Sequence, residues 1–202
     1  DAAVSRASFS PDGARILTSS GDGSARLWDA ASGAQVVLFK GHDDWVSTAA
    51  FNPSGDRVVT ASNDLTVRVW DAQSGDELAR FTDASPFTSA IFSANGERIL
   101  ATLAGGAVRV WDVASGTEIA RHERYQAPMS DVALSPDGAL MVTTSDDGLL
   151  RFWDSFWLTT LAGDELVQAA VRGRLNGMTL LSDDELALLR PVIGDVDRDV
   201  AS

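Results

Sequence analysis

Side chains suited to nucleophilic or metal chemistry are scarce in this chain. Its 202 residues include two histidines and no cysteine, and they contain no G-x-S-x-G or H-E-x-x-H motif. Adjacent carboxylates do occur, as Asp43-Asp44, Asp146-Asp147 and Asp183-Asp184. Neighbouring residues of a strand point to opposite faces, so such a pair does not form a shared acid–base site. We therefore expect a protein that is not an enzyme and that carries no cofactor or metal.

A Trp-Asp pair recurs at nearly constant spacing and indicates the elements around it. Successive pairs are 42, 41 and 42 residues apart, at Trp28, Trp70, Trp111 and Trp153. A turn ending in glycine precedes each pair, at 11–13, 53–55, 94–96 and 136–138, and short apolar runs and further turns fill the rest of each unit. Three turns per period separate four short strands. The pattern predicts an all-β array of antiparallel sheets that stack on one another.

One unit carries additional residues in a characteristic order. It reads Gly41-His42, Val46, Ala49, Phe51, the turn 52–55, Thr60, Asp64 and Trp70-Asp71. This order resembles the WD repeat of the WD40 β-propeller family, and the resemblance extends from about residue 3 to 154. It implies about four blades of four antiparallel strands, at approximately 1–40, 41–82, 83–123 and 124–161. These blades would form an incomplete ring or part of a larger propeller.

The resemblance also implies a hydrogen-bonded relay inside a blade. In the second blade His42 and Thr60 would link Asp64 to the indole N–H of Trp70, which satisfies polar groups that are unfavourable to bury alone. We interpret His42 as a structural residue and not as a ligand. The first and fourth blades keep part of the relay, as Thr18, Asp22 and Trp28 and as Thr143, Asp147 and Trp153. The third has Ala101, Gly105 and Asp83 at the threonine, aspartate and histidine positions, which predicts a looser blade.

Partners of this family often contact one face of the ring, through two positions on the first strand of a blade and one before the tight-turn aspartate. Carried over to this chain, these positions include Trp45, Ser47, Asn63, Thr88, Ser130 and Asp146. Trp45 stands out because interfaces concentrate binding energy in large aromatics, although its indole could equally cover the adjacent blade. The resemblance thus implies a non-catalytic protein-interaction scaffold or sensor module. The contrasting hypothesis is a ligand-binding or catalytic propeller, which requires ionisable groups converging at the central channel.

Charge and hydropathy limit the partners. The net charge is −13, with 15 arginines and one lysine, and no basic cluster appears, which disfavours nucleic acid. No apolar run reaches the ~18–20 residues of a membrane span, and a cytoplasmic location is the default expectation. One arginine stands two residues before each tryptophan, at Arg26, Arg68, Arg109 and Arg151. These could form a binding belt, but the interpretation we favour is that each is a structural residue, laid against a neighbouring strand or paired with an acid.

The segment 162–202 has a different pattern, which predicts a helical tail with an acidic end. Apolar spacing indicates one helix over about 164–175, and a capping box at Ser182 and Glu185 indicates another through about 189. Asp195, Asp197 and Asp199 start like a calcium loop but lack its glycine and glutamate, so we expect a solvated tail. The stretch 181–185 is weakly similar to the ending of bacterial multidomain WD-repeat proteins.

Four blades are at the lower limit of the ~4 to 8 found in propellers. Two explanations are open. The sequence could be the C-terminal part of a larger chain whose other blades close the ring, or two copies could self-associate to close it. From the sequence we favour the first.

Overall fold

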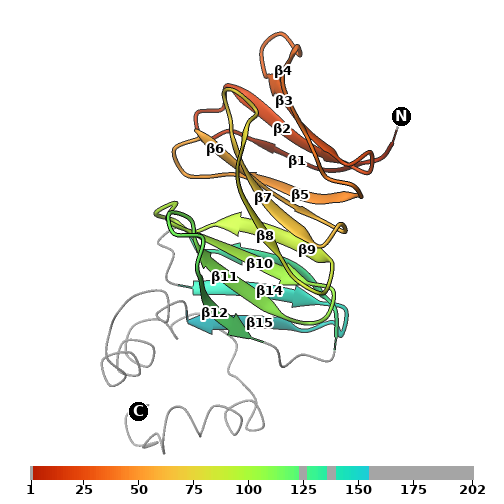
Figure 1. The fold of residues 1–202 in the computed structure, drawn as a ribbon, viewed down its shortest axis with the longest axis vertical. Coiled ribbons are helices and arrows are strands. Elements are labelled where there is room, and N and C mark those ends of the chain that lie inside the picture. Colours follow the sequence, from red (N-terminus) through yellow and green to blue (C-terminus); the bar gives the residue numbers. More distant parts are fainter. Residues whose placement is uncertain (1, 123–126, 136–139, 155–202) are drawn as a thin grey trace, which may run out of the picture. The chain divides into compact units, whose positions relative to one another are not determined.

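The part of the chain that the structure describes is entirely β. In this computed structural model the described residues are 2–122, 127–135 and 140–154, with side chains described through 151. They form four antiparallel sheets of three or four strands and include no helix, and hence none that could cross a membrane (Figure 1). The chain divides into two compact units, 1–153 and 154–202. The second unit, with both predicted tail helices and the expected domain boundary at 161, lies outside the described residues.

Each sheet is a meander of consecutive strands. The first contains β1 (Val4–Phe9), β2 (Arg15–Ser20), β3 (Ser24–Asp29) and β4 (Gln35–Lys40). The second contains β5 (Val46–Phe51), β6 (Arg57–Ser62), β7 (Thr66–Asp71) and β8 (Glu77–Thr82). The third contains β9 (Phe87–Phe92), β10 (Arg98–Leu103), β11 (Val108–Asp112) and β12 (Glu118–His122). The fourth has β13 (Met129–Leu134), β14 (Leu140–Ser145) and β15 (Leu150–Asp154) among the described residues.

The repeated turns explain the meander. Each turn between the first and second strands of the first three sheets closes with a glycine at positive φ, at Gly13, Gly55 and Gly96. A left-handed residue is accessible to glycine at little cost, so the chain reverses and the next strand pairs antiparallel to the last. Each Trp-Asp unit of the sequence therefore forms one sheet.

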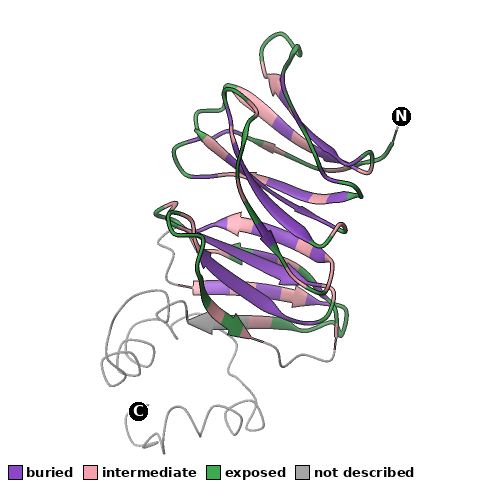
Figure 2. Ribbon diagram, viewed as in Figure 1, coloured by how far each residue is buried: buried purple, intermediate pink, exposed green. Residues whose placement is uncertain are grey.

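Two apolar cores join the first three sheets. One lies between the first and second sheets and includes Leu27, Phe39, Val58 and Trp70. The other lies between the second and third and includes Val67, Phe81, Ile99 and Trp111. Both faces of the second and third sheets are covered, so the central strands β6, β7, β10 and β11 are almost wholly buried (Figure 2). Burial on both faces explains why β6 (RVVTAS) and β10 (RILATL) are rich in Val, Ala, Ile and Leu at consecutive positions instead of alternating with charged residues.

The first strands of the sheets lie nearest one another. Strand β9 contacts β5 and β13, and β5 contacts β1, so the four first strands line one side of the array. The tryptophan of a sheet packs on the last strand of the sheet before it. The Trp70 ring lies 5.9 Å from that of Phe39, and the Trp111 ring 5.0 Å from that of Phe81.

Candidate interaction surface and its supporting relay

The second sheet brings His42, Thr60, Asp64 and Trp70 together. The Trp70 indole Nε1 donates to Thr60 Oγ1 at 2.8 Å, and His42 Nε2 is 2.7 Å from the same hydroxyl. The other ring nitrogen, Nδ1, is 2.8 Å from an Asp64 carboxylate oxygen. Thr66 completes the cluster by donating its hydroxyl to Asp64 at 2.7 Å. The side chains thus form a continuous chain of contacts from the tight turn to the sheet interior, which fixes His42 in a structural position.

Burial and hydrogen bonding displace the pKa values of this cluster. Burial lowers the pKa of His42, and the opposing attraction of Asp64 does not compensate, so the neutral imidazole is favoured. Burial would raise the pKa of Asp64, but hydrogen bonds from Thr66 and His42 stabilise the carboxylate and hold its pKa at about 2. The cluster is a neutral histidine beside an ionised aspartate. Its nitrogens and oxygens are occupied by one another, which leaves the imidazole little capacity for acid–base chemistry.

The first and fourth sheets contain shorter versions of the cluster. In the first, Trp28 Nε1 donates to Thr18 Oγ1 at 2.9 Å, while Asp22 accepts from Ser24 and Arg26. In the fourth, Thr143 is buried and Asp147 accepts from Arg151. Trp153, the remaining member of that set, has its side chain outside the described residues.

The third sheet replaces the relay with a buried ion pair. Asp83, which stands at the histidine position, accepts from Arg109 Nε at 2.6 Å, and the two side chains are only 12% and 5% exposed. Gly105 stands where the other sheets have the turn aspartate, so Arg109 is held by Asp83 instead of by that turn. The sequence alone indicated the loss of the relay but not this exchange. The sequence did contain a signal for this pair, because Asp83 stands at the position of His42 and Arg109 at that of Arg68. Looseness of this blade stays a prediction.

All four repeated arginines pair with acids, which confirms the ion-pair interpretation over a binding belt. Arg26 pairs with Asp22, Arg68 with Asp64 and Glu77, Arg109 with Asp83 and Arg151 with Asp147. The guanidinium groups neutralise carboxylates of their own sheet or, for Arg109, of the link between β8 and β9. They therefore contribute little free positive charge to a ligand site.

Trp45 lies at the entrance to β5, partly on the first sheet and partly in solvent. The side chain of this residue is large, and the residue is 42% exposed. Its six-membered ring lies against Gly21 so closely that a Cβ on that glycine would be 3.3 Å from Trp45 Cε3. Asn63 donates its backbone N–H to the Trp45 carbonyl at 3.0 Å, which joins the turn after β6 to this residue. The indole therefore both covers the adjacent sheet and presents a free surface.

The remaining expected contact residues divide into two groups. Ser47 donates its hydroxyl to the carbonyls of Ala61 and Phe87, and the Thr88 hydroxyl bonds that of Thr102, so both are engaged within the array. Asn63, Ser130 and Asp146 are exposed, and Ser130 donates to Asp146 at 2.7 Å. The role of all six in partner binding stays a proposal.

Leu65 is a further candidate that the sequence analysis missed. It is the one non-glycine residue at positive φ among the described residues, at 69°, in the same turn as Asn63. The corresponding residues of the other three sheets are Gly23, Gly106 and Gly148, all at φ of 79° or 80°. A leucine in this conformation costs roughly 1–2 kcal/mol. Its side chain is 38% exposed, so burial provides little compensation. The signal available in the sequence was that the aligned turns have glycine at this position in three units and leucine in one.

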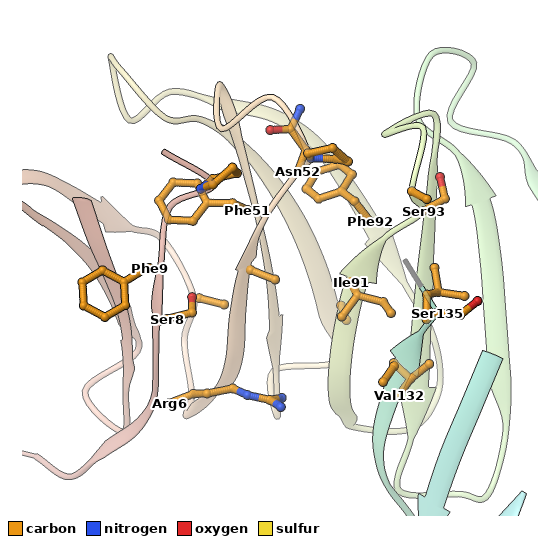
Figure 3. Close-up of a pocket in the computed structure, with 18 residues that line it drawn as sticks. Arg6, Ser8, Phe9, Phe51, Asn52, Ile91, Phe92, Ser93, Val132 and Ser135 are labelled. Atoms are coloured by element: carbon orange, nitrogen blue, oxygen red, sulfur yellow. The ribbon is translucent and has the colours of Figure 1, made fainter. Parts of the chain in front are cut away.

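The first strands of the sheets line a cavity of about 600 Å³ that is open to solvent (Figure 3). Its lining is mainly small or apolar, including Ala50, Phe51, Ile91, Val132 and Leu134. Near it Arg6 of β1 makes two hydrogen bonds to Asp131 of β13, at 3.0 and 2.7 Å, and Ser89 also donates to Asp131. Burial would raise the pKa of Asp131, but the bonds from Arg6 and Ser89 lower it. The sequence did not predict this ion pair. Arg6 and Asp131 stand at equivalent positions of their first strands, where the second and third sheets have Thr48 and Ser89.

The cavity does not contain the convergent groups that a catalytic channel requires. Arg6 is the one ionisable residue in its described lining, and Asp131 neutralises it. Within the described ranges no three His, Asp or Glu side chains are grouped so as to hold a metal ion.

Comparison with known proteins assigns the class of protein. The family model described as WD domain, G-beta repeat, matches residues 1–29, 33–71 and 116–154, which together make up a little over half of the chain. The chain therefore belongs to the WD40-repeat family, whose members generally mediate protein interactions and are typically non-enzymatic scaffolds. The model passes over 72–115, the region in which Asp83 and Arg109 replace the relay of the second sheet.

One relative is similar over a single repeat. A stretch of 39 residues, 19% of this chain, is 54% identical to human WD repeat-containing protein 86. The match spans 10% of that protein's length.

Proposed function

We propose that the chain is a non-catalytic interaction platform that captures a protein partner at the end of the array where Trp45 and Leu65 lie. The observation that carries the proposal is the half-exposed indole of Trp45, placed rigidly on Gly21. A large aromatic held in one position contributes contact area with little loss of conformational entropy on binding.

The strain at Leu65 supports the same surface. Backbone strain at an exposed position lowers stability, and such strain often marks a binding site. A glycine at this position would remove the strain, as it does in the other three sheets. An exposed leucine beside Asn63 provides an apolar contact that glycine lacks. The proposed surface, formed by Trp45, Asn63 and Leu65, therefore has two large apolar side chains and one polar side chain.

A ligand-binding channel is the alternative function. Its support is the 600 Å³ cavity between the first strands. The paired state of Arg6 and Asp131 leaves that cavity without a free charge in its described lining. We therefore favour the surface over the channel.

The test uses peptide ligands selected from a random display library on the 202-residue chain. Trp45→Ala should weaken their binding by about tenfold or more, as expected for a hot-spot residue. Leu65→Gly should weaken binding while raising the free energy of unfolding by about 1 kcal/mol. The matched control is Leu78→Ala, which removes an exposed leucine of β8 away from this surface.

Opposite effects of Leu65→Gly on stability and binding separate a binding role from a structural one. Ligands that bind Trp45→Ala and Leu65→Gly as tightly as the wild type would contradict the proposal. Ligands that lose affinity on Ile91→Trp, which fills the cavity, would instead support the channel.

The wider context of the module is also a proposal. We infer a cytoplasmic scaffold or sensor module of a bacterial multidomain protein, with protein and not nucleic acid or membrane as its partner. The net charge of −13 supports the exclusion of nucleic acid. The tail similarity that suggests a bacterial multidomain protein lies outside the described residues.

A further inference from the structure

Each of the first three sheets ends in an outer strand that has a neighbouring strand on one side. These outer strands are β4, β8 and β12, which pair with β3, β7 and β11 (Figure 1). An edge strand of this kind presents a row of N–H and C=O groups that can pair with an added strand. Within the described part of the chain, the backbone of β4 is hydrogen-bonded to β3 and to no other segment. Its outer edge is therefore available for pairing.

The outer strands of the second and third sheets each carry an ion pair. Glu77 pairs with Arg80 at 2.9 Å, and Glu118 pairs with Arg121 at 2.7 Å. The arginine side chains are 50% and 52% exposed. An added strand would have to cover these charges, and charged side chains are a common protection of sheet edges against such pairing. The edges of β8 and β12 are thus protected.

The outer strand of the first sheet lacks this protection. Gln35 stands opposite Trp28, as Glu77 and Glu118 stand opposite the tryptophans of their own sheets. Leu38 takes the place of the arginine, three residues further on, and residues 35–39 include no charged side chain. Val36 and Leu38 are 56% and 42% exposed. Strand β4 thus combines an open edge with exposed aliphatic side chains.

The exposure of Val36 belongs to the outer rim and not to the place of the first sheet in the array. Leu78 and Ile119 are its equivalents in the second and third sheets, and they are 51% and 44% exposed. Both of those sheets pack on a preceding sheet through an apolar core. A preceding sheet therefore leaves this rim position in solvent.

Size and charge indicate the occupant of the edge. Six strand residues are far fewer than the ~20–30 residues on each side of a standard protein interface, and two copies with net charge −13 repel each other. A basic segment is attracted instead. Asp76 is an exposed carboxylate beside this strand, because a Cβ on the preceding Gly75 would be 2.9 Å from Val37 Cγ1. No described residue forms an ion pair with Asp76.

We propose that β4 binds an extended, basic segment of a partner protein by strand addition. Backbone hydrogen bonds along 35–40 hold the segment as a fifth strand of the first sheet. Its alternate side chains lie on the same face as Val36 and Leu38, which selects aliphatic residues at those positions. Asp76 attracts a basic side chain of the segment. The site shares no residue with the surface formed by Trp45, Asn63 and Leu65.

Fluorescence anisotropy with a labelled synthetic heptapeptide tests the proposal on the 202-residue chain. The peptide has arginine at both ends and alternating threonine and valine between them. Gln35→Glu/Leu38→Arg installs in β4 the ion pair of β8 and β12, and it leaves the net charge unchanged. This variant should bind the peptide more weakly by about tenfold or more, with thermal stability close to that of the wild type. Leu78→Arg makes the same aliphatic-to-arginine change on β8 and should bind like the wild type.

Two N-methylated peptides distinguish backbone pairing from side-chain adhesion. The methyl groups are placed on alternate residues, in one phase or the other. One phase removes the N–H groups that face β4 and should abolish binding, whereas the other should retain it. A peptide with glutamate at both ends should bind more weakly than the arginine peptide, and the difference should shrink as salt is raised. Hydrogen exchange of β4 amides should slow when the arginine peptide is added.

Three results would overturn the proposal. The first is an arginine peptide that does not bind at its solubility limit, or that binds the Gln35→Glu/Leu38→Arg variant as tightly as the wild type. The second is equal binding of both N-methylated peptides. The third is a wild-type chain that sediments as a dimer while the double variant sediments as a monomer, which would assign the edge to a second copy.

Discussion

At the residue scale, the buried polar groups of the second sheet are matched to one another. Thr60 Oγ1 accepts from the Trp70 indole and contacts His42, so a single hydroxyl serves two partners. A buried polar group left without its partner is more costly than the hydrogen bond itself is favourable. The cluster therefore specifies one arrangement of the side chains in this sheet.

Thr60→Val tests this matching with nearly unchanged shape. The substitution should lower the free energy of unfolding by about 1–3 kcal/mol, because it leaves the Trp70 N–H and the Nε2 atom of His42 each without the Thr60 hydroxyl as partner. Urea denaturation followed by tryptophan fluorescence measures the change. Thr82→Val, on an exposed residue of β8, is the control and should have little effect. Equal stability of the two variants would contradict the role given to Thr60.

The same cluster should make stability depend on pH in two windows. The pKa of His42 is lower in the folded chain, so folding stability is complete at high pH and declines below the unfolded pKa of about 6.5 as the unfolded state takes up a proton. The Asp64 pKa of about 2 is also lowered, so its contribution is present above about pH 4 and is lost as pH falls toward 2.

Thermal melting from pH 8 to pH 2 measures both windows. His42→Gln should reduce the decline that starts near pH 6.5, and the remainder belongs to His122, whose pKa burial also lowers. Asp71→Asn, a change of a half-buried carboxylate that accepts hydrogen bonds from turn amides, serves as a comparison for the acid window. A wild-type stability that is constant between pH 7 and pH 5 would exclude the neutral buried state of His42.

At the scale of the element, the four sheets share one geometry but use different chemistry to hold it. The second sheet uses the His42 relay, the third uses the Arg109–Asp83 pair, and the first uses Thr18 with Asp22. In the third sheet the turn aspartate is replaced by Gly105, and the histidine position holds Asp83. The loss of one carboxylate is thus matched by the gain of another, which pairs with Arg109. A comparison restricted to the relay residues would therefore set the third sheet apart, although its four strands form the same meander as those of the first two sheets.

Asp83→Asn tests whether the ion pair replaces the relay. Removal of one charge from a buried pair should lower the free energy of unfolding by on the order of 3 kcal/mol, because Arg109 stays buried. Chemical denaturation provides the measurement, and Asp76→Asn, which neutralises an exposed carboxylate of the preceding turn, is the control. If both variants are within about 0.5 kcal/mol of wild type, the pair is incidental.

At the scale of the array of four sheets, one interaction connects its first and fourth members directly. Arg6 and Asp131 are 125 residues apart in sequence yet form two hydrogen bonds. Their side chains are 44% and 37% exposed, so solvent screens much of the attraction. Most of the cohesion between sheets must therefore come from the apolar cores.

A double-mutant cycle on Arg6→Met and Asp131→Asn measures the connection. We expect a coupling energy of about 0.5–1 kcal/mol, decreasing at high salt, because the pair is only half buried. Parallel cycles at low and high salt provide the check. A coupling several times larger would mean that this pair, and not the apolar contact, holds the first and fourth sheets together.

The sequence by itself determined the period, the strands and their family. Turn residues and the 2-residue alternation act locally, so the four Trp-Asp units predicted antiparallel sheets of four short strands. The positions of His42, Thr60, Asp64 and Trp70 within that period were also sufficient to place them together. Features that recur in every unit could be predicted, because the same turn residues and the same alternation act in each unit.

Only the tertiary structure decided which side chains meet between sheets and which are left uncovered. The Asp83–Arg109 and Arg6–Asp131 pairs join residues 26 and 125 positions apart, and such contacts depend on how the sheets stack. The exposure of Phe9 against the burial of Phe92 likewise reflects neighbours and not residue type. Burial is a property of the surroundings in space, which a local pattern does not contain, so the contact of the Trp45 ring with Gly21 became visible only in the fold.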